Sequence, residues 1–387
     1  MRAMPGAMAR LASRPAGATA PLPNPWVEAI AAYVPGKAAL GRGGRAPAKL
    51  SANENPLGPP PAAIEAAAAT LARAHIYPDG ASTALREALA AKYGLDPARI
   101  LCGAGSDELL QLAAAAFAGP GDEVLFPAHA FAVYPIAAQR VGATPVEAPD
   151  RDWTADVDAL LAAVTPHTRL LFLANPNNPT GTMISAAEVA RLHAGLRPDI
   201  LLVLDSAYAE YLDRADYDDG LALSKTAPNV LTTRTFSKIH ALAALRVGWC
   251  HGPAPVIAAM DKVRGPFNTT TAGIAAAVAA LADDAAVERA RAHNRQWRDW
   301  LFAELARLSN HGIRAIPSVA NFVMLVFPKE GPITAGAAFR ALAEAGFMTR
   351  WLAPQGMDEC LRISVGTAEE TQGVAAALRA WVEGAAG

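Results

Sequence analysis

A lysine inside a hydrophobic segment is the residue of this sequence best suited to covalent chemistry. Lys238 lies within Thr235-Phe-Ser-Lys238-Ile-His-Ala-Leu-Ala-Ala-Leu-Arg246, between hydroxyl residues and an apolar run. Burial lowers the pKa of an ammonium group, and the resulting free amine forms imines with carbonyl compounds. Arg246 begins the next predicted strand and can return to the same site. The alternative for Lys238 is a structural salt bridge to Asp205.

Two further groups of polar residues follow predicted strands. In Asn175-Pro-Asn-Asn-Pro-Thr-Gly181, the prolines restrict the backbone and Gly181 permits a sharp turn, so the asparagine side chains would be held in fixed directions. An ordinary turn is the alternative. Asp205 ends the apolar run that begins at Ile200. A buried carboxylate needs a partner because desolvation is costly, and a cationic ligand nitrogen, a core arginine or a helix cap would each serve.

A third polar turn, Gly103-Ala-Gly-Ser-Asp107, follows a predicted strand and opens a helix. Backbone N–H groups at the start of a helix attract anions, and small residues allow a ligand to approach closely. The turn therefore suits a phosphate group. Its glycines do not match the dinucleotide-binding fingerprint, and a glycine-rich turn without a ligand is the alternative.

These groups would be positioned by short apolar strands that alternate with helices. Such a pattern predicts an α/β fold with a mostly parallel sheet between two layers of helices. Polar residues that follow the strands then meet at the carboxyl edge, where ligands bind. The expected strands are 100–102, 123–126, 169–174, 200–205, 230–235 and 246–250, and the expected helices are 64–75, 83–93 and 107–117.

After Val256 the pattern changes to longer helices and a final unit with strands at 321–327 and 361–365. We therefore expect a large domain at 59–265 and a smaller α+β domain at 266–387, which the segment 24–58 joins. Residues 1–23 are basic, lack acids and are rich in Ala and Pro, so we interpret them as a disordered leader rather than a transit peptide.

Composition excludes several classes of protein. The 387 residues are 52% apolar, so a sizeable core can form, and no apolar run reaches the roughly 18–20 residues that a membrane-spanning helix needs. A net charge of −2 gives no field that would attract nucleic acid. The three cysteines are isolated, so we expect neither a disulfide framework nor a metal site, and a cytoplasmic location.

Taken in order, these motifs resemble the fold-type-I pyridoxal-phosphate aminotransferases: the asparagine-proline turn, a strand ending in Asp205-x-x-Tyr208, and Ser-Lys238 with Arg246 eight residues on. The resemblance covers about residues 24–385. Four segments are similar to the histidinol-phosphate aminotransferase branch of that family. They are Leu50-Ser-Ala-Asn-Glu-Asn-Pro-Leu-Gly58, Tyr77-Pro-Asp-Gly80, Arg350-Trp-Leu-Ala-Pro-Gln-Gly356 and Leu361-Arg-Ile-Ser-Val-Gly-Thr367.

The resemblance implies pyridoxal phosphate as cofactor and a role for each motif. Lys238 would bind the cofactor through an imine and then move the substrate proton, while Asp205 would keep the pyridine nitrogen protonated. Asn178 and Tyr208 would hydrogen-bond the phenolic oxygen, and Phe131 would stack on the ring or belong to the core. The candidates for the cofactor phosphate are Gly105, Ser106, Asp107 (through its backbone N–H or as a helix cap), Thr235, Ser237 and Arg246.

The resemblance also implies how substrates bind. Arg362 would clamp the anionic end of each substrate, because its planar fork suits carboxylate or phosphate, and Arg350 would add a second cation for phosphate. Asn53 and Asn55 would lie near the substrate ring, and Asn178 and Tyr77 would also contact the substrate. Tyr77 would reach the cofactor phosphate of the neighbouring subunit, which implies a homodimer with shared active sites.

The implied reaction converts histidinol phosphate and 2-oxoglutarate to imidazole-acetol phosphate and glutamate, a step of histidine biosynthesis. An aromatic amino-acid aminotransferase and a decarboxylase of a phosphorylated amino acid are the alternatives on the same scaffold. A cofactor-binding regulator and a catalytically silent binding protein are alternatives from another class. Ser206, the pair His240-Ala241 and Phe131 depart from the residues usual in the family, so the choice of substrate is the least determined feature.

Overall fold

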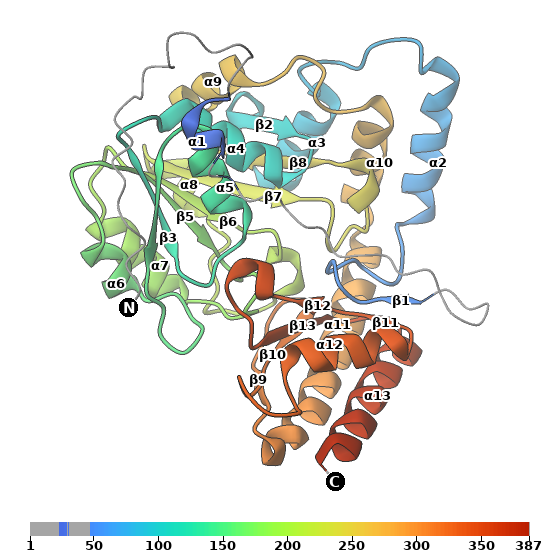
Figure 1. Ribbon diagram of the computed structural model, residues 1–387. Helices are drawn as coiled ribbons and strands as arrows, with labels where there is room; N and C mark the ends of the chain where they lie inside the picture. Colours follow the sequence, from blue (N-terminus) through green and yellow to red (C-terminus); the bar gives the residue numbers. More distant parts are fainter. Residues whose placement is uncertain (1–22, 29, 31–46, 387) are drawn as a thin grey trace, which may run out of the picture.

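A seven-stranded sheet forms the centre of the larger of two domains in the computed structural model, which describes residues 23–28, 30 and 47–386 (Figure 1). Its strand order is β2-β8-β7-β6-β5-β3-β4, and only β8 runs antiparallel to its neighbours. The expected fold class, α/β with a mostly parallel mixed sheet, is therefore confirmed. The strands are β2 (Ile100–Gly103), β3 (Glu123–Pro127), β4 (Thr144–Ala148), β5 (Thr168–Ala174), β6 (Leu201–Asp205), β7 (Val230–Thr235) and β8 (Gly248–His251).

The edge strand β4 is absent from the strands expected from the sequence. It has the sequence TPVEA, and only its last residue is buried. An edge strand tolerates a proline and an exposed glutamate because one side of its backbone pairs with no other strand. The continuous apolar run that marks the central strands is therefore missing from it.

Helices cover both faces of the large sheet, as the apolar runs of its central strands require. Leu170 and Phe172 of β5 pack in a cluster with α4 and α5, whereas Leu171 and Leu173 pack with α6 and α7 on the other face. The alternation follows from strand geometry. The helices are α2 (Pro61–Thr70), α3 (Thr83–Tyr93), α4 (Ser106–Phe117), α5 (Val133–Arg140), α6 (Val157–Ala162), α7 (Ala186–Gly195), α8 (Leu221–Thr226), α9 (Ala254–Val263) and α10 (Thr271–Leu281).

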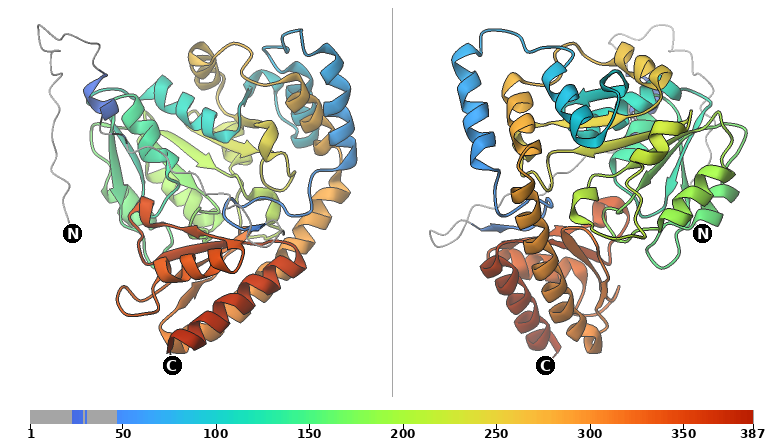
Figure 2. Two further views of the ribbon diagram at one scale, coloured as in Figure 1. Left: turned by 45° about the vertical axis from the view of Figure 1, so that its right-hand side comes forward. Right: turned by 180° about the vertical axis from the view of Figure 1, so that it is seen from behind.

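The small domain is a four-stranded antiparallel sheet with helices on one side (Figure 2). Its strand order is β12-β13-β10-β9, and a separate parallel pair joins β1 to β11. The short strands were not expected because two or three residues carry no recognisable period. The elements are β1 (Ala48–Lys49), β9 (Arg314–Ile316), β10 (Phe322–Val326), β11 (Phe347–Met348), β12 (Arg350–Trp351), β13 (Cys360–Ser364), α11 (Asp284–Ala306), α12 (Ala335–Glu344) and α13 (Ala368–Ala386).

The boundary between the domains lies later than the expected position at residue 265. Helix α10 packs in one cluster with Leu85 and Leu89 of α3, so it belongs with the large domain. Its alanines Ala276, Ala277 and Ala280 are fully buried. An alanine-rich helix packs equally well in either domain, so its composition does not reveal its neighbours. The passage to the small domain occurs within the long helix α11 (Figure 2).

The expected joining segment 24–58 contacts both domains where it is described. The short helix α1 (Pro25–Glu28) lies against the large domain, with Trp26 beside Gly142, while β1 pairs with β11 of the small domain. The expected leader, residues 1–23, lies outside the described residues except for Pro23. Among the described residues, every helix is too short or too polar to cross a membrane.

Candidate active site

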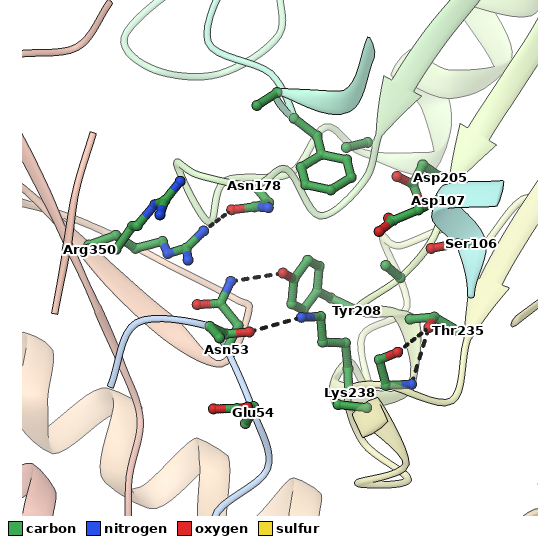
Figure 3. A pocket seen from close by; sticks show the side chains of 18 of the residues that line it. Asn53, Glu54, Ser106, Asp107, Asn178, Asp205, Tyr208, Thr235, Lys238 and Arg350 are labelled. Atoms are coloured by element: carbon green, nitrogen blue, oxygen red, sulfur yellow. Dashed lines mark hydrogen bonds between the residues drawn. The ribbon is translucent and has the colours of Figure 1, made fainter. Parts of the chain in front are cut away.

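A cavity of about 320 Å³ lies where the carboxyl ends of β5, β6 and β7 face the small domain. Arg350 lies at one end of it, Ser106 and Thr235 lie at the other, and Lys238 lies between them (Figure 3). Thirteen of the sixteen residues expected at a site line this cavity, which brings together segments that are far apart in sequence. They are Asn53, Ser106, Asp107, Phe131, Asn178, Asp205, Tyr208, Thr235, Ser237, Lys238, Arg246, Arg350 and Arg362.

Lys238 extends into the cavity from the loop that follows β7. Its Nζ donates to the carbonyl oxygen of Ala52 at 3.2 Å and lies 5.7 Å from the centroid of the Tyr208 ring. Burial, helped by the guanidinium of Arg362, lowers the pKa of Lys238 from 10.5 to about 8. No ion pair joins Lys238 to Asp205 in the described part of the chain, so the structural salt bridge is not formed. The amine is thus placed and tuned for nucleophilic chemistry.

Asp205 is the last residue of β6, and its carboxylate is 4% exposed. Tyr134 donates its hydroxyl to Oδ2 at 3.0 Å, and Thr233 donates its hydroxyl to Oδ1 at 3.1 Å. Burial nevertheless raises the pKa of Asp205 from 3.8 to about 6. The carboxylate is oriented by two donors but costly to ionise, so a cationic group of a ligand beside it would stabilise its charged form.

The end of the cavity near α4 has the chemistry of a phosphate site. Arg246 donates from Nη1 to the Ser237 hydroxyl oxygen at 3.2 Å and from Nη2 to the carbonyl of Ala104 at 3.2 Å. A Cβ on Gly105 would lie 2.3 Å from Arg246 Nη2, so only glycine allows the arginine to lie against the N-terminus of α4. A guanidinium, a helix N-terminus and hydroxyl groups together suit a dianion.

The opposite end carries two buried arginines on adjacent strands. Arg350 of β12 and Arg362 of β13 are direct partners in the antiparallel ladder, and they are 8% and 7% exposed. Arg362 donates to the carbonyl of Ser51 at 2.8 Å and to the side-chain oxygen of Asn178. Like charges opposite each other on a sheet repel, so an anionic ligand between them would be stabilising. The pair fits substrates with carboxylate or phosphate groups.

Asn53 and Tyr208 connect the two domains at the cavity wall. Asn53 donates from Nδ2 to the Tyr208 hydroxyl at 2.9 Å and accepts at Oδ1 from the Ser364 hydroxyl at 2.9 Å. The backbone of Asn53 has φ 56°, which asparagine tolerates better than most residues. Burial raises the pKa of Tyr208 to about 12, so its hydroxyl stays protonated and can donate to a ligand oxygen.

Three residues expected at the site do not line the cavity. Gly105 contributes through the close approach of Arg246 to its backbone. Asn55 donates from Nδ2 to the carbonyl of Ile239 at 2.8 Å, so it supports the lysine loop instead of facing a substrate. Tyr77 is 78% exposed and stacks on Phe267 with ring centroids 4.7 Å apart, outside the cavity of its own chain.

Several residues that the sequence did not single out contribute to the site. Tyr134 and Thr233 hold Asp205, and Glu54 and Gln355 line the cavity. Thr233 stands two residues before Thr235 on β7, so strand alternation places both side chains on one face. That spacing is a signal available in the sequence. Tyr134 has no comparable signal, because its contact with Asp205 depends on how α5 packs on the sheet.

The lowered pKa of Lys238 predicts a distinctive pH profile for its reaction with aldehydes. In the ligand-free protein, reaction of Lys238 with a small aromatic aldehyde is expected to rise with pH around a midpoint near 8, because the free amine appears as pH passes the pKa. Borohydride trapping followed by peptide mass spectrometry measures the modified fraction at each lysine. The exposed Lys262 in the same sample is the control. Identical profiles for the two lysines would contradict the desolvation of Lys238.

Comparison with known proteins gives a consistent result. Residues 46–378 match the family model described as aminotransferase class I and II. The histidinol-phosphate aminotransferase of Sphingopyxis alaskensis is 57% identical over 368 residues, covering 94% of this chain and 98% of the relative. That of Zymomonas mobilis is 54% identical, covering 93% and 97%. The crystal structure of histidinol-phosphate aminotransferase from Sinorhizobium meliloti in complex with pyridoxal-5'-phosphate superposes with a TM-score of 0.79 at 30% identity, covering 87% of this chain and 91% of that one.

Proposed function

Because the chain belongs to the class I and II aminotransferases, we propose that it transfers the amino group of histidinol phosphate to 2-oxoglutarate. The products are imidazole-acetol phosphate and glutamate, and the step belongs to histidine biosynthesis. The observation that carries the proposal is one cavity that holds a desolvated lysine between a dianion site and a pair of buried arginines. The names of relatives that are 57% and 54% identical over nearly their whole length support the choice of substrate.

The residues present fit pyridoxal phosphate as the cofactor. Lys238 provides an amine with a lowered pKa, and Asp205 provides a buried carboxylate whose charge a cationic group would stabilise. Arg246, with Ser237 and the start of α4, would hold the phosphate. When bound, pyridoxal phosphate supplies an aldehyde that bonds to amines and a ring that accepts the electron pair released at the substrate α-carbon.

The side chains around Lys238 would divide the catalytic work. Lys238 would act first as the base that takes the proton from the substrate α-carbon and then as the acid that gives the proton back. Asp205 would lie beside the ring nitrogen of the cofactor and, when ionised, would favour its protonated form. Tyr208 and Asn178 would donate hydrogen bonds to the phenolic oxygen of the cofactor. Phe131 lies on the cavity wall, where its ring can pack on the face of the cofactor.

Substrate selection would rest on the paired arginines. Both glutamate and histidinol phosphate carry an anionic group, and one cavity must accept each in turn. Arg362 would bind the anionic end of both substrates, and Arg350 would add the second guanidinium that a phosphate dianion uses best. Asn53 would contact the substrate from its place beside Tyr208.

Steady-state kinetics with a substrate panel test the proposal. Purified protein with cofactor is expected to give its highest kcat/KM with histidinol phosphate when it is compared with phenylalanine and tyrosine. A preference for phenylalanine or tyrosine would favour an aromatic amino-acid aminotransferase. Release of carbon dioxide without a keto acid would instead favour a decarboxylase. A protein that stays colourless after addition of the cofactor would contradict both enzyme classes.

Loss of the second guanidinium should affect the phosphorylated substrate most. Arg350→Gln is expected to raise the KM for histidinol phosphate by roughly 10- to 100-fold, because a charge-assisted contact to phosphate is lost. The KM for glutamate should rise less, since Arg362 remains. Arg340→Gln, at an exposed arginine of the same domain, is the matched control. Equal increases of both KM values would contradict a specific role in phosphate binding.

The protein would act as a homodimer, because several large apolar side chains are exposed on the surface of the large domain. They are Ile64, Leu71, Ile76, Tyr77, Val263 and Phe267, each at least 45% exposed. Pairing of two copies through this surface would bury them and bring Tyr77 toward the cofactor phosphate of the partner subunit. Light scattering after size exclusion measures the assembly. A cytoplasmic location remains a prediction from the three isolated cysteines.

A further inference from the structure

The segment 151–154 forms a tight hairpin at the junction of the two domains. Arg151 and Thr154 exchange backbone hydrogen bonds of 2.8 and 3.0 Å, which leaves two residues in the turn. Both of them, Asp152 (φ 49°) and Trp153 (φ 64°), have left-handed backbone conformations. Such a turn favours glycine and asparagine. A tryptophan there is strained, so contacts elsewhere must hold it in place.

Some of those contacts come from the large domain, where the His129 ring lies with its centroid 4.5 Å from that of Trp153, and the others come from the small domain. The ring of Trp153 packs on a buried cluster made of Ile316, Met324, Leu352, Met357 and Cys360. Asp152, next to it, forms an ion pair with Arg314 of β9. The hairpin thus contributes one apolar and one charged contact across the junction.

The apolar cluster lies in the same cross-strand row as the two substrate-binding arginines. Arg350 is the ladder partner of Arg362, Arg362 is the partner of Met324, and Met324 is the partner of Ile316. Directly opposite residues of neighbouring strands share one face of a sheet. The row therefore runs from two arginines that enter the cavity to two apolar side chains that Trp153 covers. Leu352, another member of this cluster, follows Arg350 by two residues.

The hairpin is also tied to the loop that carries Asn178. The Thr182 hydroxyl donates to the carbonyl of Trp153 at 2.8 Å, and the backbone N–H of Val319 donates to the carbonyl of Gly181 at 2.8 Å. A Cβ on Gly181 would lie 2.2 Å from the Ser318 hydroxyl oxygen, so the small domain packs directly against this loop. Trp153 therefore contacts both parts of the site that hold the substrate anion.

We propose that Trp153 is a positioning residue for substrate binding: it fixes the small-domain sheet on the large domain so that Arg350 and Arg362 point into the cavity at a set distance from Lys238. This inference rests on the proposed function, because it assumes that the arginines bind the anionic groups of the amino donor and the keto acceptor. Trp153 itself lies outside the residues that line the cavity.

Kinetics of the full-length, cofactor-loaded protein test this role. Trp153→Ala is expected to raise the KM of both the amino donor and the keto acceptor by about tenfold, with kcat changed by less than about threefold. Cofactor affinity should be unchanged, since Trp153 contacts neither Lys238 nor Arg246. Trp153→Phe, which keeps a ring, should restore KM values close to those of the wild type. Should Trp153→Ala not fold, Trp153→Leu is expected to show a smaller rise of both KM values.

Trp300→Ala provides the matched control, because Trp300 is a partly buried tryptophan of α11 that packs on the small-domain core. It should lower stability without changing KM. Hydrogen exchange gives a readout independent of activity: the Val319 amide should exchange faster in Trp153→Ala and at the wild-type rate in Trp300→Ala. Unchanged KM values in Trp153→Ala, or an equal rise in Trp300→Ala, would overturn the inference. If the wild-type protein prefers another amino donor, only the proposed substrate is overturned. The role of Trp153 is then tested by measuring the KM values of the same variants with the preferred donor.

Discussion

Lys238→Ala is expected to lower kcat for transamination by at least about 10⁴-fold, because it removes both the covalent attachment of the cofactor and the group that moves the substrate proton. The lysine is the amine at the centre of the cavity, and burial holds its pKa near 8, within reach of neutral pH. Steady-state rates with histidinol phosphate measure the loss. Tyr208 and Arg362, which surround the amine, remain in the variant.

Two measurements separate loss of chemistry from loss of structure in Lys238→Ala. Circular dichroism should match that of the wild type, and the cofactor-free variant should unfold at no lower temperature. Within the described residues the side chain makes one hydrogen bond, to the carbonyl of Ala52, and its buried ammonium lowers stability at neutral pH. A small primary amine added to the solution should restore part of the activity, because it can enter the space that the side chain leaves. Wild-type turnover by the variant would refute the assignment of Lys238 as the catalytic amine.

Asp205→Asn is expected to lower kcat by about 10³-fold while cofactor still binds, because an amide cannot keep the ring nitrogen protonated. Asparagine has nearly the same shape, and Tyr134 and Thr233 remain as hydrogen-bonding neighbours. The cofactor absorbance spectrum reports binding, and single-turnover mixing with the amino donor reports the proton-transfer step. Tyr134→Phe is the control, since it removes one donor to the carboxylate but keeps its charge. A normal kcat in Asp205→Asn would count against its pairing with the ring nitrogen.

The same substitution should stabilise the cofactor-free protein. The pKa of Asp205 is raised from 3.8 to about 6 by burial, so the folded state binds its proton more tightly than the unfolded state. The contribution of Asp205 to stability is therefore fully present below pH 3.8 and is lost as pH rises through 6. The loss amounts to about 3 kcal/mol at neutral pH. Asp205→Asn should show no such loss, so its stability advantage over the wild type should grow between pH 4 and pH 7.

Thermal unfolding of both cofactor-free proteins at a series of pH values measures this difference. Other groups titrate in the same range, but they are common to the two proteins and cancel in the comparison. A constant difference across the pH range would contradict the raised pKa. The expected result would also mean that the buried carboxylate lowers the free energy of unfolding when the cofactor is absent. Such a cost is common at sites where the fold shifts the pKa of a catalytic group.

The sequence alone determined the central sheet and the chemistry of the site. The buried strands β5 and β6 contain continuous apolar runs, and a run of that kind rarely forms anything other than a central strand. Asn178 follows β5, Asp205 ends β6 and Lys238 follows β7, and the carboxyl ends of parallel strands meet at one edge of the sheet. Their convergence therefore follows from local patterns and one rule of topology.

Only the tertiary structure decided which side chains touch across long separations in the chain. The contact of Tyr134 with Asp205 depends on the packing of α5, and the placement of α10 in the large domain depends on alanines that would pack equally well elsewhere. The row from Arg350 to Ile316 depends on the registers of four short strands, two of which carry no pattern of their own. Strand register and helix packing depend on how many side chains fit together at once. These side chains are distant in the sequence, so no short stretch of sequence predicts the result.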